Sequence, residues 1–464
     1  MLRQKFAVAV IFLASSALCV AADSHVIPTT TFVAETSNNT SAANAFRAQS
    51  NGNGGVGNVS KVNVHSLLYP GATTKVYAHL VLWFGGANHM NVGYSSADKA
   101  QVARQVHDMV ERGIDGVIID WYGPGNSIDE ATKMVMVEAE SHPGFTFAVM
   151  VDKGAIQWNS CSGCTPQQAL IQQLKYVEQT YFGSPAYMRS AGLPVVSNFD
   201  IDLSYTIDWP AVRAALQSSP TFLFQNANGF THPLAGGSYS WVIPSTADLG
   251  MQYLDNFYAT GLFFPDQQAV GAAYKGFNDT LAAWGAGRVM SQGCGQTWLQ
   301  TFSTINAFHN SSKPLPAMQL VTWNDYEEGT EIESGIENCV SVNAIEAAGT
   351  LQWTIQGDES TVDHYTLFVS NDGQNLMPLG DVASGNHSVG LCEYSLAPGA
   401  VHTLYVQAVG KPSLRNHMSE PMTYVPQCTK ALRPRPTRNN PPSSPQLSEH
   451  PQVIGKRAVD GFQQ

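Results

Sequence analysis

Between residues 75 and 339 the chain alternates short apolar runs rich in β-forming residues with longer stretches whose apolar residues recur at helical spacing. A period of two residues is typical of strands and a period near 3.6 is typical of helices, so the alternation predicts strands and helices in succession. Eight strands are expected, at residues 76–84, 116–121, 145–151, 194–199, 221–226, 239–243, 269–277 and 317–323. Eight strands, most of them separated by helices, over about 260 residues predict an α/β fold of the (β/α)8 TIM-barrel type.

A doubly wound open sheet is the structural alternative to this barrel. That fold would favour a glycine-rich phosphate loop directly after the first strand. Residues 84–87, which read Phe-Gly-Gly-Ala, lack the pattern. The sequence therefore favours the barrel over the open sheet.

Acidic residues stand where the predicted strands end. Asp120, Asp152 and Asp200 each close or directly follow an apolar run. The carboxyl ends of barrel strands converge on one face, and the active sites of this fold lie there. One such Asp is often a helix cap or a turn former. Several at equivalent positions predict a shared acidic site.

The last predicted strand leads into a dense acidic segment. Only 13% of the chain is charged, yet the segment 325–333 contains Asp325, Glu327, Glu328, Glu331 and Glu333. Crowded carboxylates raise one another's pKa values. A pair with separated pKa values suits acid/base or nucleophilic work on a glycosidic bond. A solvated acidic turn and a calcium loop are the alternatives for this segment.

Charge and the N-terminal segment indicate where such a protein acts. The net charge of −12 argues against nucleic acid as a partner. Residues 1–22 predict a secretory signal that is too short to span a membrane, and no later segment is long and apolar enough to do so. Cys19 lies in that signal, and the other six of the seven cysteines predict disulfides of unassigned pairing. We expect a secreted or periplasmic protein without a membrane span.

Composition also divides the chain into domains. Residues 23–74 are predicted to be a low-complexity leader or linker, and residues 75–339 to be the barrel. Residues 340–427 contain short alternating runs between turn signals, which predict a small all-β sandwich. Residues 428–464 are predicted to be a disordered Pro-rich tail. We expect the chemistry in the barrel alone.

Four segments of the barrel region resemble known enzymes. They read VYAHLVLWF at 76–84, GIDGVIIDWYGP at 113–124, WVIP at 241–244 and TWNDYEEGTEIE at 322–333. Together they look like glycoside hydrolase families 71 and 99, which are endo-acting α-glucanases and α-mannosidases on (β/α)8 barrels. Residues 340–427 resemble a fibronectin type III module, with His402 in place of the usual corner Tyr.

The resemblance implies roles for particular residues. In family 99 the last motif holds two catalytic Glu three positions apart, and these positions are Asp325 and Glu328 here. Asp325 followed by Tyr326 is closer to the family 71 pattern, which leaves the substrate open between the two families. No cofactor and no metal ion are expected. The candidate substrate-binding residues are His79, Trp83, Asp120, Trp121, Tyr122, Asp152, Asp200, Trp241, Trp323 and Asn324.

The expected function is that of a secreted, monomeric, endo-acting glycoside hydrolase whose partner is an α-linked polysaccharide, either α-1,3-glucan or α-mannan. A non-catalytic, lectin-like glycan-binding protein on the same barrel is the alternative. A calcium-dependent adhesion protein is the third reading, although the acidic segment lacks the regular Asp/Asn alternation of an EF-hand. The sugar, the linkage and the retaining or inverting outcome stay open.

Overall fold

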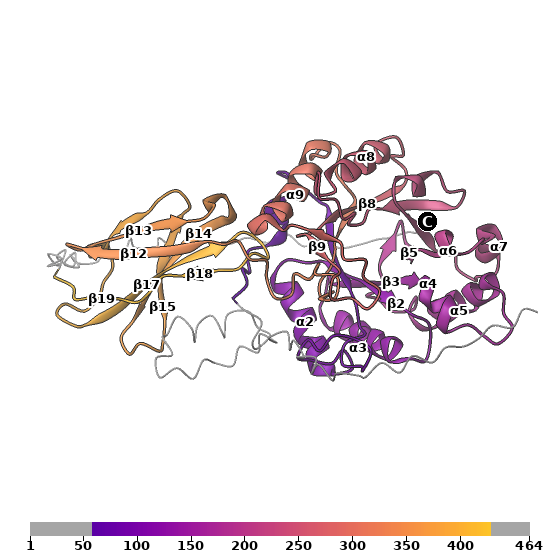
Figure 1. The fold of residues 1–464 in the computed structure, drawn as a ribbon, viewed down its shortest axis with the longest axis horizontal. Helices are drawn as coiled ribbons and strands as arrows, with labels where there is room; N and C mark the ends of the chain where they lie inside the picture. The colour runs from indigo at the N-terminus through magenta and orange to yellow at the C-terminus, as the bar shows by residue number, and fades with distance from the viewer. Residues whose placement is uncertain (1–57, 428–464) are drawn as a thin grey trace, which may run out of the picture.

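The computed structural model describes residues 58–427 of the 464-residue chain. The predicted signal at 1–22, the leader as far as residue 57 and the tail at 428–464 lie outside the described residues. Figure 1 shows an α/β part, coloured indigo to salmon, joined end to end with an all-β part in orange and yellow.

Eight parallel strands of the α/β part close into a barrel. Their order is β3, β2, β1, β11, β8, β7, β6, β5, and β3 also pairs with β5, which completes the ring. The predicted (β/α)8 barrel is therefore confirmed, and the open doubly wound sheet is excluded. The strands are β1 (Lys75–Leu80), β2 (Gly116–Trp121), β3 (Thr146–Asp152), β5 (Leu193–Phe199), β6 (Thr221–Gln225), β7 (Ala235–Tyr239), β8 (Gln268–Ala273) and β11 (Ala317–Leu320), with β4 (Arg189–Ser190) added antiparallel to β5.

Helices surround this sheet (Figure 1). In the first of them, Val102, Val106 and Met109 are buried at spacings of three or four residues, so that one face packs on the strands. Asp98 caps the same helix by accepting a hydrogen bond from the backbone N–H of Ala100. The helices are α2 (Lys99–Glu111), α3 (Ser127–Ser141), α4 (Lys153–Trp158), α5 (Pro166–Thr180), α6 (Ile201–Ser204), α7 (Trp209–Ala214), α8 (Met251–Gly261) and α9 (Gln296–Phe308).

One strand is displaced from its predicted position, and β1, β8 and β11 end three or four residues before their predicted ends. We expected a strand at residues 239–243, but β7 ends at Tyr239 and begins at Ala235. Its sequence, Ala-Gly-Gly-Ser-Tyr, has little β propensity. Glycine is required there by close packing, because a Cβ on Gly237 would lie 2.0 Å from the carbonyl oxygen of Gln268 on β8.

The all-β part is a sandwich of two antiparallel sheets, as predicted. One sheet contains β12, β13 and β16, and the other contains β15, β14, β17 and β18, with β19 paired to β17. Trp353, Tyr365 and Leu404 are buried in the core between them. The resemblance to a fibronectin type III module stays a prediction. The strands are β12 (Ser341–Ala347), β13 (Thr350–Gln356), β14 (Val362–Ser370), β15 (Met377–Ala383), β16 (Ser388–Gly390), β17 (His402–Gly410), β18 (His417–Met418) and β19 (Met422–Tyr424).

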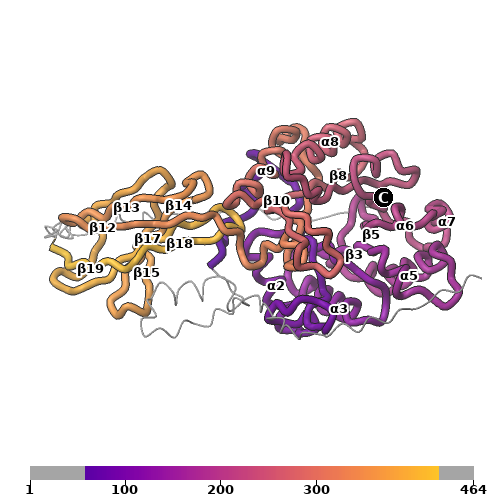
Figure 2. Tube along the Cα trace, viewed as in Figure 1, coloured from indigo at the N-terminus to yellow at the C-terminus, as the bar shows by residue number. Residues whose placement is uncertain are grey.

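The two parts lie end to end (Figure 2) and share buried surface at one loop of the sandwich. Leu414, between β17 and β18, is fully buried within the hydrophobic core of the barrel. The indole N–H of Trp298 on α9 donates to the carbonyl of Pro412 at 3.0 Å. Ser413 and Arg415 exchange backbone hydrogen bonds with Ile336. The sandwich is therefore anchored to the barrel through its core and not through a flexible tether.

The segment just before the barrel is packed as well. We expected the leader to extend to residue 74, but Val59 and Val64 are buried, and residues Val64–Leu67 form a 3₁₀ turn. The backbone N–H of Ser60 donates to the carbonyl of Leu414 at 2.8 Å. From residue 58 onward the chain thus belongs to the packed structure.

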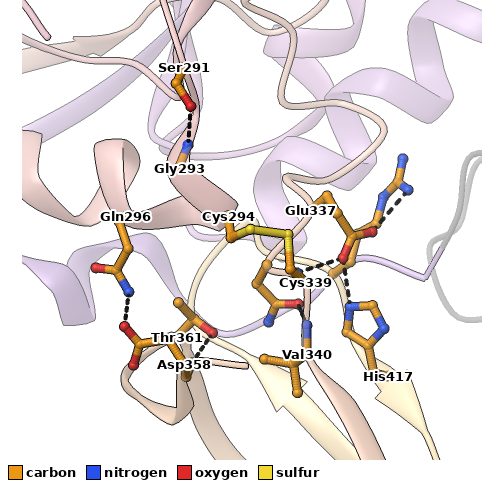
Figure 3. Close-up of a disulfide and its surroundings, with 12 residues drawn as sticks. Ser291, Gly293, Cys294, Gln296, Glu337, Cys339, Val340, Asp358, Thr361 and His417 are labelled. Atoms are coloured by element: carbon orange, nitrogen blue, oxygen red, sulfur yellow. Dashed lines mark hydrogen bonds and ion pairs between the residues drawn. A yellow bond between two sulfur atoms is a disulfide. The ribbon is translucent and has the colours of Figure 1, made fainter. Parts of the chain in front are cut away.

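Two disulfides have both of their cysteines within the described residues, Cys161–Cys164 and Cys294–Cys339. The second joins the start of α9 to the segment that enters the sandwich (Figure 3). Close to it, Glu337 forms ion pairs with His417 and Arg415 of the sandwich. These contacts fasten the junction on the side that Figure 3 shows. Within residues 58–427, no helix combines the length and the apolarity needed to cross a membrane.

We predict that Leu414→Ala lowers the free energy of unfolding by about 2–4 kcal/mol, because it opens a cavity in the barrel core. Urea denaturation of the full chain measures the change. Val401→Ala is the matched control, since Val401 lies in the same sandwich but is 64% exposed. Equal stability of the two variants would show that the loop does not anchor the sandwich.

Candidate active site

The carboxyl ends of the barrel strands surround one large cavity of about 1180 Å³. Its walls come from the loops that follow the strands, as expected for this fold. The cavity is larger than the roughly 300–1,000 Å³ typical of a site for one small molecule. Nine of the residues predicted to act or to contact substrate line it: His79, Trp83, Asp120, Tyr122, Asp152, Asp200, Trp241, Asp325 and Glu328.

The strand ends bring the acidic residues together. Asp120 is the fifth residue of β2, Asp152 is the last residue of β3, and Asp200 directly follows β5. These three strands are neighbours in the barrel and run parallel, so their ends meet at one rim. Asp325 follows β11 and opens into the same cavity. The predicted common rim is thus found.

The acidic segment 325–333 divides into residues that face the cavity and residues that do not. Asp325 and Glu328 line the cavity. Glu327 does not line the cavity; it pairs with His89 at 2.9 Å and accepts from the backbone N–H of Met90. Glu331 pairs with Lys275 at 2.6 Å. Two of the five acidic residues are therefore available to a substrate.

Glu333, the last of the five, lies in a buried polar network behind the site. Its carboxylate accepts hydrogen bonds from the hydroxyls of Tyr94 and Tyr326 and from the amide of Gln105. A buried carboxylate is tolerated where donors of this kind surround it. Because the side chains of the segment have separate partners, they do not converge on a common cation. Among residues 58–427, no group of three His, Cys, Asp or Glu side chains is placed to hold a metal ion.

Asp325 is held in one orientation by the backbone of its own turn. Its Oδ1 accepts from the N–H groups of Glu327 at 3.0 Å and Glu328 at 2.9 Å. The N–H of Asp325 donates to Thr322 Oγ1 at 2.8 Å. The side chain is 4% exposed. Burial and the nearby charge of Glu328 raise the pKa of Asp325 well above its usual range, although the two N–H donors oppose this.

Glu328 is more exposed to solvent than Asp325, and a side-chain donor and a cation lie near its carboxylate. The indole N–H of Trp284 donates to its Oε1 at 3.2 Å. Burial raises the pKa of Glu328 above its usual value, while Trp284 and the charge of Arg288 counteract the rise. Because the charge of Glu328 raises the pKa of Asp325, the titrations of the two groups depend on each other. One can hold a proton while the other is ionised.

Two further carboxyl groups in the cavity have perturbed pKa values. Burial, together with the charges of Asp152, Asp325 and Glu328, raises the pKa of Asp120 well above its usual range. Burial also raises the pKa of Asp152 to about 6, against opposition from the N–H of Gly154. Clustered carboxyl groups with raised pKa values are typical of acid/base sites.

The floor of the cavity contains a neutral histidine. Burial lowers the pKa of His79 to about 3, so its imidazole carries no charge at neutral pH. Its ring packs edge-on against Trp241 with 4.7 Å between centroids. A neutral imidazole beside an indole suits an uncharged, hydroxyl-bearing ligand better than an anion.

Three of the predicted substrate-binding residues do not line the cavity. Trp121 is fully buried and donates its indole N–H to Asp129. Trp323 is also fully buried, with the guanidinium of Arg112 4.8 Å from its ring centre. Asn324 accepts from the N–H of Val81 and donates to its carbonyl, which joins the ends of β11 and β1. In these positions the three residues support the loops around the cavity.

Some cavity residues were missed at the sequence level. Trp158 at the end of α4 and Trp284 in the hairpin of β9 (Phe277–Asn278) and β10 (Val289–Met290) line the cavity, as do Lys153 and Arg288. Trp158 is the last residue of the short helix α4, which directly follows Asp152 at the end of β3, and this position was the available signal. The sequence contains no comparable signal for Trp284, because its loop is long and irregular.

Comparison with protein-family models found no match, and no curated protein matches the chain. Among solved structures, the GH99 endo-alpha-mannosidase from Bacteroides thetaiotaomicron in complex with BIS-TRIS-propane is similar over 56% of this chain and 87% of its own. The identity is 15% and the TM-score 0.46. A glycoside hydrolase-like protein is similar over 56% of this chain and 86% of its own, with 14% identity and a TM-score of 0.43.

We predict that Asp152→Asn is more stable than the wild type at pH 7 and loses this advantage near pH 4. The pKa of Asp152 is higher in the folded chain than its ordinary 3.8. Its ionisation therefore destabilises the fold as the pH rises from about 4 to about 6, and Asn cannot ionise. We expect a difference of roughly 1–3 kcal/mol, measured by thermal unfolding at both pH values.

Asp129→Asn is the control with the opposite sign. Burial would raise the pKa of Asp129, but hydrogen bonds from Tyr176 and Tyr181 outweigh it, and the pKa lies below its usual value. Ionised Asp129 therefore stabilises the folded state, and its Asn variant should be less stable at pH 7. If both variants shift stability in the same direction, the electrostatic description of the cavity is wrong.

Proposed function

We propose that the protein is a secreted, endo-acting glycoside hydrolase that cleaves an α-linked polysaccharide, α-1,3-glucan or α-mannan, with Asp325 and Glu328 as its carboxylate pair. One observation carries the proposal. Of the five acidic residues after β11, these two alone line the cavity at the carboxyl ends of the strands. The other three are bound to His89, Lys275 and the Tyr94 network.

Hydrolysis of a glycosidic bond needs two carboxyl groups in different protonation states. One donates a proton to the glycosidic oxygen as the bond to the anomeric carbon breaks. The other, ionised, either activates a water molecule or attacks the anomeric carbon itself. Burial and the charge of Glu328 raise the pKa of Asp325, which favours a state in which Asp325 holds a proton while Glu328 is ionised.

The surroundings of the pair also favour a neutral sugar. Lys153 is paired with Asp200, and Arg288 with Asp279. Lys153 and Arg288, the lysine and the arginine that line the cavity, are thus each neutralised by a carboxylate. An anionic sugar would meet several acidic groups without a free cation to bind it. Secretion is supported by the predicted signal and by the two disulfides in the described residues.

We predict that Asp325→Asn and Glu328→Gln each fold normally and lose about 10²–10⁴-fold in turnover, because each removes a positioned acid or base with little change in shape. Release of reducing ends from soluble α-glucans and α-mannans measures activity. The double variant should lose little more than the worse single variant, since the pair acts as a unit. The pH–rate profile of each variant should lack the limb that its missing group produces.

Glu331→Gln is the matched control within the same segment. It removes one charge, but Glu331 lies outside the cavity, so turnover should change far less than in the two variants of the pair. Equal damage in all three variants would contradict the proposed pair. Binding of glycan by the wild type without release of reducing ends would instead support the glycan-binding alternative.

A further inference from the structure

Trp158 exposes an unusually large part of its ring at the mouth of the cavity. It is 70% exposed, whereas a tryptophan side chain is usually largely buried. One face of the indole stacks on Tyr122, with 5.7 Å between centroids and 8° between the planes. The other face is open. An indole held flat with one free face is a ready surface for the apolar face of a sugar ring.

The local backbone fixes this ring in place. A Cβ on Gly154 would lie 2.5 Å from the rings of both Trp158 and Tyr122, so only glycine leaves room for the stack. The next residue, Asn159, donates its amide to the carbonyl of Pro124 at 2.8 Å. The stacking surface is therefore preorganised, which reduces the entropy lost when a ligand binds.

Trp284 is a second exposed indole at the same mouth. It is 49% exposed and lies in the β9–β10 hairpin. Asp279 holds this hairpin by accepting from the backbone N–H groups of Ala286 and Arg288 and from the Arg288 side chain. Trp284 contacts Trp83 edge-on at 6.0 Å and donates its N–H to Glu328.

The barrel places these two indoles on opposite sides. Trp158 follows β3 and Trp284 follows β8, and these strands are separated by three others in either direction around the ring. Tyr122 and Trp83, with centroids 6.1 Å apart, connect them. The four rings form an aromatic track, Trp158–Tyr122–Trp83–Trp284, that crosses the mouth beside the carboxylate pair.

Resting on the proposed function, we propose that this track binds an extended glycan chain across the carboxylate pair, with Trp158 and Trp284 as the outer stacking platforms. A cavity larger than one small-molecule site fits such a chain. Sugars at both ends of the track place the scissile bond in the interior of the chain. Long substrates therefore gain binding energy that short ones cannot reach.

The test compares long with short oligosaccharides of α-1,3-glucan and α-mannan. In Trp158→Ala, the ratio of kcat/KM for a long substrate to that for a short one should fall about tenfold, as expected for one lost ring contact. Trp158→Phe should keep most of the ratio. Phe263→Ala is the control, because Phe263 is 82% exposed but lies after α8, away from the cavity.

Trp284→Phe separates the two roles of the other platform. It keeps a ring but loses the N–H that donates to Glu328, so the pH–rate limb of Glu328 should move to higher pH while the length ratio falls little. In Trp284→Ala, the ratio of kcat/KM for a long substrate to that for a short one should fall as well.

Two results would overturn the track. The first is a Trp158→Ala variant that behaves like Phe263→Ala. The second is a Trp158→Ala variant whose kcat/KM falls by the same factor on short and long substrates.

A binding experiment separates this inference from the proposed function. Asp325→Asn, with and without Trp158→Ala, is run by affinity electrophoresis in gels that contain the same glucans and mannans. If glycan binding depends on Trp158 but the wild type does not hydrolyse glycan, the proposed hydrolase activity is contradicted and the aromatic track is supported. If no glycan binds, both proposals are contradicted.

Discussion

Several carboxyl groups, most of them buried, line one cavity, and their mutual repulsion is the constraint that the surrounding hydrogen bonds must offset. Removing a carboxylate from water is costly, and each neighbour of like charge adds to the cost. The protein offsets part of it locally: two backbone N–H groups hold Asp325, an indole N–H holds Glu328, and Gly154 N–H holds Asp152. The uncompensated part of this cost raises the pKa values of Asp120, Asp152, Asp325 and Glu328.

Buried polar networks behind the cavity keep its wall in position. Asp129 accepts hydrogen bonds from Trp121, Tyr176, Tyr181 and the N–H of Gly125, and so fixes the loop that contains Tyr122. Glu333 and Asn324 act similarly at the end of β11, where they tie the acidic segment to the first strand and its helix. These groups do not face the cavity, but a shift in any of them would move side chains that do.

Much of the fold could be predicted because strands and helices differ in period. In α2 and α5 the buried residues recur at spacings of three or four, and this helical period is visible in the sequence. The β7 strand was misplaced because its glycines satisfy a packing requirement from β8, which no local pattern records. The position of Trp121 was in principle readable from the alternation along β2: Asp120 and Tyr122 face the cavity, so the residue between them faces the opposite side.

The sequence by itself determined the barrel, the rim on which acidic residues gather and the segment from which the candidate pair comes. Only the tertiary structure decided which of five neighbouring acidic residues open into the cavity, because their partners are far away along the chain. Glu327 binds His89, 238 positions earlier, and Glu333 binds Gln105, 228 positions earlier. These pairs form when β1 and β11 close the ring. The aromatic track has the same origin, since its rings come from loops that meet only across the mouth of the closed barrel.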